Sequence, residues 1–316
     1  MSILHKSTTA FVLGAGLALA PLQAAAQYPE RPVTFVVPWP PGDLEDVLTR
    51  LIADAFQARH GVAAAVVNRP GGGGGPFPGA ISVAEAPADG YTVGSFVNPV
   101  VAVGPFIGIP ELDPDPFEPL GAFLTYPFLL AARGDAPFSS LEELAAHAKD
   151  NSVALGHFGA RAAPTRVSFA LAQSFGFEWG GDAAFDALDC NTLASGDADV
   201  INTTVQLVLP CLGELKILAS YTSERISILP EVPTAGELVP ELDLFLWNGL
   251  FVRKGTPDDA KAAIIEAARE AVASGPAQDV ARTTGAQVYW LGPEETAARI
   301  EGDIATFQRI NEMLDD

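Results

Sequence analysis

Short apolar runs alternate with helical patterns along most of this chain. The clearest helical pattern begins at Leu44, where apolar residues recur at helical spacing, and it ends before Gly61. Alternation of strands and helices predicts an α/β protein with mostly parallel sheets. Strands are expected at residues 33–37, 64–67, 91–96, 123–131, 153–155, 199–201, 217–219, 249–252 and 287–291. Further helices are expected at residues 140–147, 165–175, 182–193, 257–273 and 293–313.

The run from Val33 to Asp46 joins an apolar strand to a helix through a proline-rich turn. The first turn of a helix carries backbone N–H groups without partners inside the helix, and the helix dipole adds about half a positive charge there. Small anions bind at such ends for this reason. We therefore regard this turn as the strongest ligand-binding candidate in the chain.

Residues 1–26 have the pattern of a secretory signal peptide. Lys6 precedes an apolar stretch from residue 11 to residue 20, and small residues end the segment before Gln27. We take Gln27 as the mature N-terminus; the alternative is an uncleaved N-terminal anchor. Neither this stretch nor a later one reaches the roughly 20 apolar residues of a membrane span, so we expect a soluble mature protein without membrane insertion.

The length and charge of the chain limit its organisation and its partners. About 290 residues follow the signal segment, which is more than one core usually supports and favours two lobes. The formal charge is −21, and removal of Lys6 with the signal makes it −22. Such a charge opposes binding to nucleic acid or to an anionic membrane surface. A small molecule is therefore the expected partner.

The two cysteines, Cys190 and Cys211, allow one disulfide bond. An oxidising compartment would permit them to pair. The alternative is a pair of small buried thiols, which we favour because disulfide geometry is demanding.

Motifs for catalysis and nucleotide binding are weak in this chain. The glycine-rich run at residues 70–79 lacks the Lys-Ser/Thr of a phosphate-binding loop and the spacing of a dinucleotide fingerprint. The three histidines of the mature chain, His60, His147 and His157, lack metal-ligand spacing, and no G-x-S-x-G motif occurs. We therefore expect no catalytic residue, no cofactor and no metal ion.

Five segments resemble the substrate-binding proteins of tripartite tricarboxylate transporters, also called the Bug family. They are residues 28–42 (YPERPVTFVVPWPPG), 67–71 (VNRPG), 88–92 (ADGYT), 229–234 (LPEVPT) and 247–257 (WNGLFVRKGTP). Together they span nearly the whole mature chain in order, which makes the resemblance specific.

The resemblance implies a type II periplasmic-binding-protein fold, in which two α/β lobes close about a hinge on a ligand in a central cleft. It implies a periplasmic receptor that captures a small carboxylate and delivers it unaltered to a membrane permease. We expect residues 27–125 and 222–316 to form lobe 1, residues 126–221 to form lobe 2, and the protein to be a monomer. The alternatives are a ligand sensor for a membrane kinase and a small enzyme with His157 as base.

In this family, backbone N–H groups and ordered water hold the carboxylate at two loops that face each other across the cleft. The lobe 1 turn corresponds here to Trp39, Pro40, Pro41, Gly42 and Asp43. The lobe 2 loop corresponds to residues 156–165, which include His157, Gly159, Ala160, Arg161 and Thr165.

Asp43 stands where relatives usually carry the second glycine of a pair. We favour a role for it as the N-cap of the following helix, with Asp46 three residues later. A capping carboxylate would occupy the N–H groups that otherwise hold a ligand anion. We therefore expect Asp43 to weaken or redirect carboxylate binding at this turn, and a zwitterionic or partly cationic ligand merits a test.

A cationic set in the lobe 2 loop consists of His157, Arg161 and Arg166, where relatives carry small hydroxyl residues and, at the position of Arg166, a histidine. Guanidinium groups bind carboxylates through two parallel hydrogen bonds. We expect Arg161 or Arg166 to bind the ligand carboxylate or to pair with Asp43 on closure. The alternative is a surface salt bridge for each arginine.

The carboxyl ends of strands supply the remaining candidates, because ligands bind there in open α/β sheets. Asn98 follows one predicted strand, and Asn202 and Thr203 follow another. Trp39 is expected to stack on an aromatic ligand or to cover the hinge, and Trp247 to lie in the core or hinge.

Overall fold

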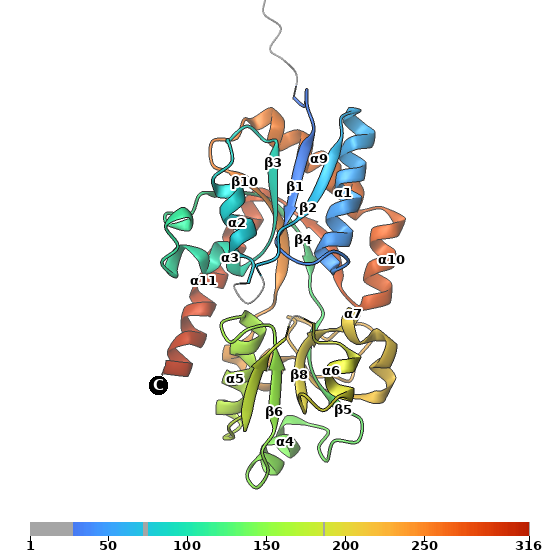
Figure 1. Cartoon of the computed structure of the whole chain (residues 1–316), viewed down its shortest axis with the longest axis vertical. Helices are drawn as coiled ribbons and strands as arrows, with labels where there is room; N and C mark the ends of the chain where they lie inside the picture. Colours follow the sequence, from blue (N-terminus) through green and yellow to red (C-terminus); the bar gives the residue numbers. More distant parts are fainter. Residues whose placement is uncertain (1–27, 72–74, 186, 316) are drawn as a thin grey trace, which may run out of the picture.

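The protein folds into two lobes, each built around one β-sheet (Figure 1). The computed structural model describes residues 28–71, 75–185 and 187–315; the predicted signal segment and Gln27 lie outside these ranges. The first sheet contains β1 (Val33–Val37), β2 (Ala64–Asn68), β3 (Thr92–Val97), β4 (Phe117–Thr125), β10 (Trp247–Arg253) and β11 (Gln287–Leu291). The second contains β5 (Phe128–Arg133), β6 (Ala154–His157), β7 (Gly181–Ala184), β8 (Val200–Thr204) and β9 (Leu215–Ser220). The strand orders are β11-β4-β10-β3-β1-β2 and β7-β6-β8-β5-β9.

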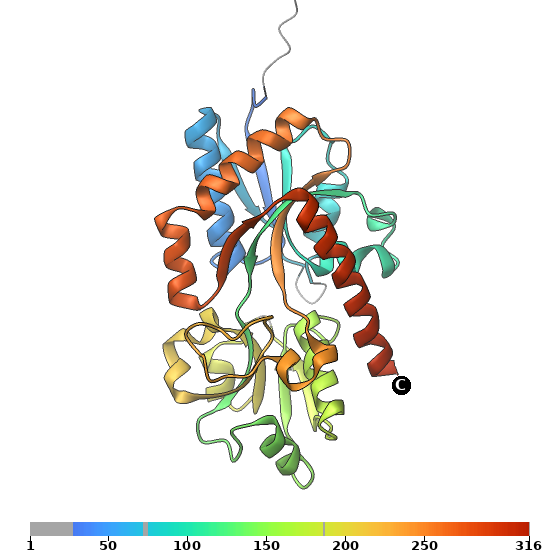
Figure 2. The same ribbon diagram turned by 180° about the vertical axis from the view of Figure 1, so that it is seen from behind.

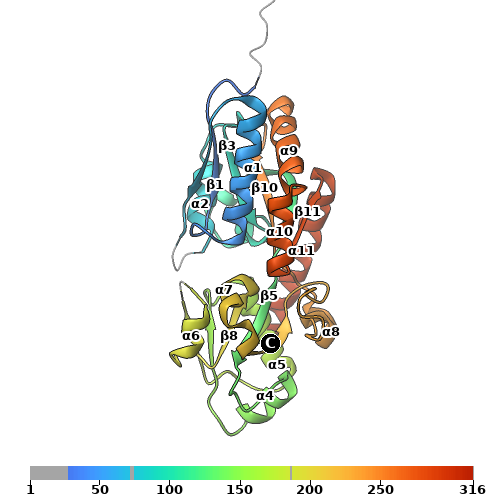
Figure 3. The same ribbon diagram turned by 90° about the vertical axis from the view of Figure 1, so that its right-hand side faces the viewer.

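Helices flank both sheets (Figures 1 and 3). The first sheet is accompanied by α1 (Leu44–His60), α2 (Phe77–Ala84), α3 (Pro99–Ala102), α9 (Asp258–Val272), α10 (Gly275–Thr284) and α11 (Pro293–Asp315). The second is accompanied by α4 (Leu141–Ala148), α5 (Ala163–Ser174), α6 (Cys190–Ala194), α7 (Val205–Val208) and α8 (Ala235–Leu238).

Helix α1 forms because its apolar residues fall on one face. Leu48, Ile52 and Phe56 are buried at helical spacing, and α1 lies beside α9 (Figure 3). Gly61 ends the helix with φ of 71°, a left-handed conformation that glycine adopts without steric cost. The predicted helix over this region is therefore confirmed, and its N-terminus lies at the end of β1.

The sheets are mixed, so the prediction of mostly parallel sheets is wrong. Parallel pairing is confined to β1 with β2 and β3, and to β6 with β7 and β8. Strands β4, β5, β9, β10 and β11 pair antiparallel. The antiparallel strands include β4 and β10 of the first sheet and β5 and β9 of the second. These are the last strand before and the first strand after each passage of the chain between the sheets.

Two predicted elements differ from the structure. The run at residues 123–131 is not one strand, because β4 ends at Thr125 and β5 begins at Phe128 in the other sheet. The predicted helix at residues 182–193 contains β7 instead, and helix begins only at Cys190. Asp189 explains this start, because its side chain accepts hydrogen bonds from the N–H groups of Asn191 and Thr192.

The connection between the lobes runs through Tyr126 and Pro127, which lie between β4 and β5. The N–H of Tyr126 donates to the carbonyl oxygen of Leu246 at 2.9 Å, so the outgoing and returning segments are hydrogen-bonded where they cross. Thr234 pairs with Ser220 at the end of β9. This pairing keeps the segment after residue 222 beside the second sheet, which favours a return crossing near residue 246. The predicted lobe boundaries at 125 and 222 stay a prediction.

Helix α11 runs from the first lobe along the side of the second (Figures 1 and 2). It contacts β4 in the first lobe and α5 in the second. Arg166 of α5 donates from Nη2 to Oδ1 of Asn311 in α11 at 2.7 Å. Across the described ranges, no helix is both long and apolar enough to cross a membrane.

A disulfide bond joins Cys190 and Cys211 in the second lobe, so the favoured alternative of two buried thiols is wrong. The bond links the start of α6 to the segment after α7, which are 21 residues apart in sequence. Leu188, Leu193 and Val208 are buried in the same small hydrophobic cluster. The bond therefore closes a loop over a minor core of the second lobe.

Replacement of both cysteines by alanine should lower the free energy of unfolding by about 3 kcal/mol, because the unfolded chain loses a loop constraint of this length. Urea unfolding followed by circular dichroism measures the difference. The double variant should be insensitive to reductant, whereas the wild type should lose a similar amount of stability when reduced. Two free thiols in the oxidised, denatured wild type would contradict the bond.

Candidate functional site

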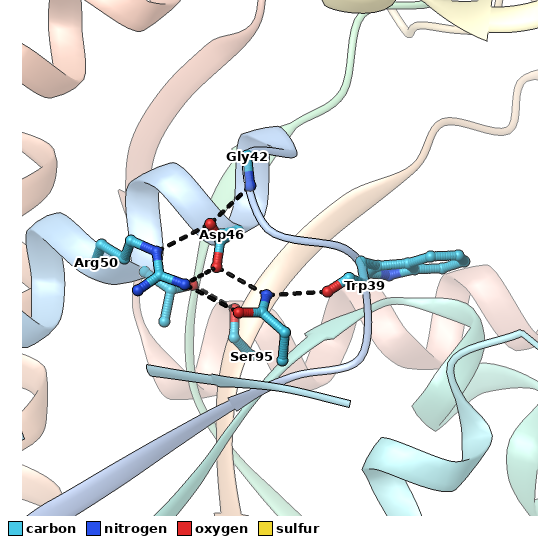
Figure 4. Close-up of polar contacts among 7 residues, drawn as sticks. Trp39, Gly42, Asp46, Arg50 and Ser95 are labelled. Atoms are coloured by element: carbon cyan, nitrogen blue, oxygen red, sulfur yellow. Dashed lines mark hydrogen bonds and ion pairs between the residues drawn. The ribbon is translucent and has the colours of Figure 1, made fainter. Parts of the chain in front are cut away.

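One buried carboxylate, that of Asp46, fixes the turn between β1 and α1 (Figure 4). Arg50 donates to it from Nε at 3.0 Å and from Nη2 at 2.9 Å, and the N–H of Gly42 donates at 2.8 Å. The Asn68 amide donates to Asp46 at 2.8 Å and to the carbonyl oxygen of Trp39 at 3.0 Å. Burial would raise the pKa of Asp46, but the hydrogen bonds from Arg50, Gly42 and Asn68 hold it below its usual value.

Asp43 occupies the N-cap position of α1 but does not cap the helix. Its backbone is extended, as in an N-cap, yet its carboxylate accepts no capping hydrogen bond. Asp46 reaches back to Gly42 instead. The favoured prediction that Asp43 caps the helix is therefore wrong. The prediction that a capping Asp43 would compete with a ligand anion for the N–H groups is wrong for the same reason. Burial and the neighbouring Asp46 raise the pKa of Asp43 to about 6.

Glu45 is a buried acid that the sequence analysis missed. Its side chain is 4% exposed. Burial and the negative charge of Asp43 raise the pKa of Glu45 to about 8, against the effect of its own backbone N–H and of Tyr126. Its position was readable from the sequence, because Glu45 precedes Leu48 and Ile52 at helical spacing and so lies on the apolar face.

The start of α5 in the second lobe differs from the start of α1, because it carries neither acidic residues nor a capping side chain. Ala162 is its N-cap residue, so no side chain caps the helix, and its first turn contains no acidic residue. The N–H of Ala162 donates to the carbonyl oxygen of Gly159 at 3.0 Å, with Gly159 at φ of 132°. Ala160 and Arg161 are exposed in this loop. The α5 end is thus an uncapped helix N-terminus, whereas the α1 end carries three acids.

The side chain of His157 in β6 bonds to Asp182 in β7 and is 2% exposed. Its Nδ1 accepts from the N–H of Gly159 at 2.9 Å, which leaves the proton on Nε2 to be donated to Asp182 at 2.8 Å. Both ring nitrogens are therefore engaged, and the geometry does not present a free base. Within residues 28–71, 75–185 and 187–315, no three His, Cys, Asp or Glu side chains group as a metal site.

The two arginines of the predicted cationic set lie apart from Asp43. Arg161 is exposed in the loop before α5. Arg166 contacts Asn311 of α11, so the expected pairing of Arg166 with Asp43 is not present in this structure. The Nε of Arg166 is buried and has no hydrogen-bond partner within the described part of the chain. A direct ligand contact from either arginine stays a prediction.

Asn98 and Trp247 serve the core of the first lobe. Both are fully buried and donate to Asp303 of α11, Asn98 from Nδ2 at 2.8 Å and Trp247 from Nε1 at 2.7 Å. Burial raises the pKa of Asp303 to about 6 against these hydrogen bonds. The structure thus places Trp247 in the core, one of the two expected positions, and ties Asn98 to α11.

Asn202 and Thr203 lie on β8 behind the start of α5. Asn202 donates from Nδ2 to Thr165 Oγ1 at 3.4 Å and to Ser168 Oγ at 3.2 Å, and Thr203 donates to the carbonyl oxygen of Leu188 at 2.6 Å. Asn202 is fully buried, and its Oδ1 has no partner among the described residues. Thr165 is also fully buried, so this group supports α5 from within the second lobe.

Gln206, which the sequence analysis did not single out, links the two lobes. Its Nε2 in α7 donates to the carbonyl oxygen of Gly42 at 2.7 Å. The turn before α1 is therefore in contact with α7 of the second lobe. Trp39 is half-buried against the hydrophobic core beside this turn, and Pro40 is exposed. A glutamine after a strand carries no sequence signal of such a contact.

The two-sheet fold defines a two-lobed α/β binding protein of the type II periplasmic-binding-protein class. The family model described as tripartite tricarboxylate transporter family receptor matches residues 48–315. The chain belongs to this family of solute-binding receptors, and the resemblance found in the sequence is confirmed.

Similar proteins of known sequence or structure agree with this assignment. Protein BugT of Bordetella pertussis is 29% identical over 307 residues, covering 93% of this chain and 92% of BugT. The periplasmic binding protein BugD is 25% identical with a TM-score of 0.77, covering 91% of this chain and 98% of that structure. MatC from Rhodopseudomonas palustris with bound malate is 26% identical with a TM-score of 0.76, covering 90% of this chain and 99% of that structure.

Substitution of Asp46 by Asn should lower the free energy of unfolding by about 2–3 kcal/mol, because the buried network loses its negative charge and one of its two acceptor oxygens. Urea unfolding of the variant and the wild type gives the difference. Asp54→Asn is the matched control, since Asp54 is exposed on the same helix and should change stability by less than about 0.5 kcal/mol. Equal effects of the two substitutions would contradict the role of Asp46.

Proposed function

We propose that this protein is a periplasmic receptor that captures a small carboxylate between its lobes and delivers it to a tripartite tricarboxylate-type permease. The observation that carries the proposal is the contrast between the two helix starts. The α5 end has no acidic first turn and no capping side chain, whereas the α1 end carries Asp43, Glu45 and Asp46. A ligand carboxylate is favoured at the first and repelled at the second.

The carboxylate therefore binds at the loop before α5. Backbone N–H groups of the first turn face the ligand there, and Arg161 lies exposed next to them. Thr165 and Asn202 stand behind this turn and hold it in place. The malate bound by MatC is a carboxylate of the expected size. The proposed lobe 2 contacts are Gly159, Ala160, Arg161 and Arg166. The buried His157, Thr165, Asn202 and Thr203 support them from behind.

The other end of the ligand faces the turn before α1. Asp43 is only partly buried there and does not cap the helix, so its charge is available to a partner. A hydroxyl or ammonium group on the ligand would satisfy it, whereas a second carboxylate would not. The ligand class that fits both ends is a hydroxy acid or an amino acid. The proposed lobe 1 contacts are Trp39, Pro40, Gly42 and Asp43, whereas the expected contact from Asn98 is not proposed because its side chain is buried against Asp303.

The remaining parts of the proposal follow from the family. Residues 1–26 direct the chain to the periplasm and are removed, and the mature protein is a monomer. One lobe contains residues 27–125 and the C-terminal part of the chain. We propose that the return crossing lies near residue 246 instead of the expected residue 222, because Thr234 pairs with Ser220 of the second sheet. The receptor neither inserts into the membrane nor binds nucleic acid. The ligand is bound and released without chemical change, in keeping with a family of receptors.

The shift in melting temperature across a panel of ligands tests the proposal. Hydroxy acids, amino acids, dicarboxylates, tricarboxylates and amines are added to the mature protein at increasing concentration. A ligand that binds only the folded state raises its stability with concentration. Saturable shifts with hydroxy acids or amino acids are expected. Shifts confined to amines without a carboxylate would contradict binding at the α5 end.

Substitution of Ala162 by Asp should weaken binding of the panel's best carboxylate at least tenfold. An aspartate at the N-cap accepts the N–H groups that the ligand uses and adds a negative charge. Isothermal titration calorimetry measures the dissociation constants. Asn151→Asp is the charge-matched control, because Asn151 is exposed in the same lobe after α4. Unchanged affinity in Ala162→Asp would place the carboxylate elsewhere.

A further inference from the structure

One side-chain hydrogen bond joins the second lobe to the turn before α1 in the first. Gln206 of α7 donates from Nε2 to the carbonyl oxygen of Gly42 at 2.7 Å, and the two residues are 164 positions apart in sequence. Figures 1 and 3 both show α7 at the end of the second lobe that faces the start of α1. We call the bond between Gln206 and Gly42 the interlobe clasp. It lies at the turn to which one end of the proposed ligand is assigned.

The backbone of Gly42 is held from both lobes. Its N–H donates to Asp46 of α1 at 2.8 Å, and its carbonyl oxygen accepts from Gln206. Gly42 has φ of 95°, in the left-handed region that favours glycine. A Cβ added at Gly42 would meet no atom within 4 Å, so the backbone conformation and not a lack of space calls for glycine here. The first lobe therefore fixes the turn in the conformation in which its carbonyl oxygen meets Gln206.

Helix α7, which carries Gln206, is itself held in place on both sides. Val205, its first residue, donates from its N–H to the carbonyl oxygen of Pro127 at 3.1 Å, directly before β5. Val205 and Val208 are fully buried in the small hydrophobic cluster of the second lobe. The disulfide bond of this lobe follows three residues later, at Cys211. The crossing segment and the disulfide bond therefore both limit the movement of α7.

We propose that the interlobe clasp holds the two lobes together and that Gln206 is a positioning residue for ligand capture. A receptor that binds its ligand between two lobes loses apparent affinity when the closed, binding-competent arrangement becomes less populated. Both partners of the clasp are uncharged, so its loss weakens all ligands of the site by a similar factor. This effect on affinity rests on the proposed function, whereas the clasp itself does not.

Small-angle X-ray scattering of the mature protein without added ligand tests the clasp. Gln206→Met keeps the length of the side chain and removes its donor, so its radius of gyration should be larger than that of the wild type. Gln173→Met is the matched control, because Gln173 is an exposed residue of α5 in the same lobe. Its radius should equal that of the wild type. Equal radii for Gln206→Met and the wild type would overturn the proposal.

Isothermal titration calorimetry with the best carboxylate of the panel tests the role in ligand capture. The dissociation constant should rise about two- to tenfold in Gln206→Met, as expected for the loss of one hydrogen bond, and should not change in Gln173→Met. An unchanged dissociation constant in Gln206→Met would overturn the positioning role. Failure of the proposed function has a different signature, because no panel ligand would then bind the wild type while the difference in radius would persist.

Loss of the disulfide bond should act through the same clasp, because the bond anchors the segment that follows α7. The variant with Cys190→Ala and Cys211→Ala should have a larger radius of gyration than the wild type. Adding Gln206→Met to that variant should not enlarge the radius further, since coupled changes are not additive. A full additional increase would contradict the anchoring of α7 by the disulfide bond. Gln206→Met keeps the proposal testable if the variant without cysteines fails to fold.

Discussion

The ion pair of Asp46 with Arg50 is the constraint on which the ligand-facing side of the first lobe depends. The carboxylate is buried, and its four hydrogen bonds connect the turn, the helix and β2. A buried charge is tolerated only when it is paired and hydrogen-bonded in this way. Because Asp46 accepts a hydrogen bond from Gly42, the proline-rich turn is held in one backbone conformation. The start of α1 and the Gln206 contact with the second lobe both follow from that conformation.

The first turns of α1 and α5 differ in electrostatic character. At α5, the side chain of Ala162 cannot cap the backbone N–H groups of the first turn, so they stay available to the carboxylate proposed above. At α1, burial and Asp46 raise the pKa of Asp43, and burial and Asp43 raise the pKa of Glu45. A symmetric dicarboxylate would meet attraction at one end and repulsion at the other. A ligand bound as proposed would therefore have one preferred orientation between the lobes.

Much of this organisation was predictable from the sequence, and the failures have physical causes. Val33–Val37 and α1 follow from an apolar run and helical spacing, which are local signals. The break at Tyr126 and Pro127 was missed because both halves of the run are apolar and only the tertiary fold assigns them to different sheets. The residue type of Asp43 is typical of an N-cap. In the structure, however, it is the carboxylate of Asp46 that accepts the hydrogen bond from the N–H of Gly42, and it also accepts one from Asn68. Contacts such as Arg166 with Asn311 lie 145 residues apart and leave no local pattern.

The C-terminal helix α11 has a mechanical consequence for any motion between the lobes. It packs on β4 and supplies Asp303 to the core of the first lobe, yet its far end lies against α5 of the second. The lobes therefore cannot part by bending at the crossing segments alone. The surface of α5 must slide along α11, which is shear between packed helices and favours small displacements. Any opening of this receptor would thus be limited by the contact between α5 and α11, a helix pair far along the sequence from both crossings.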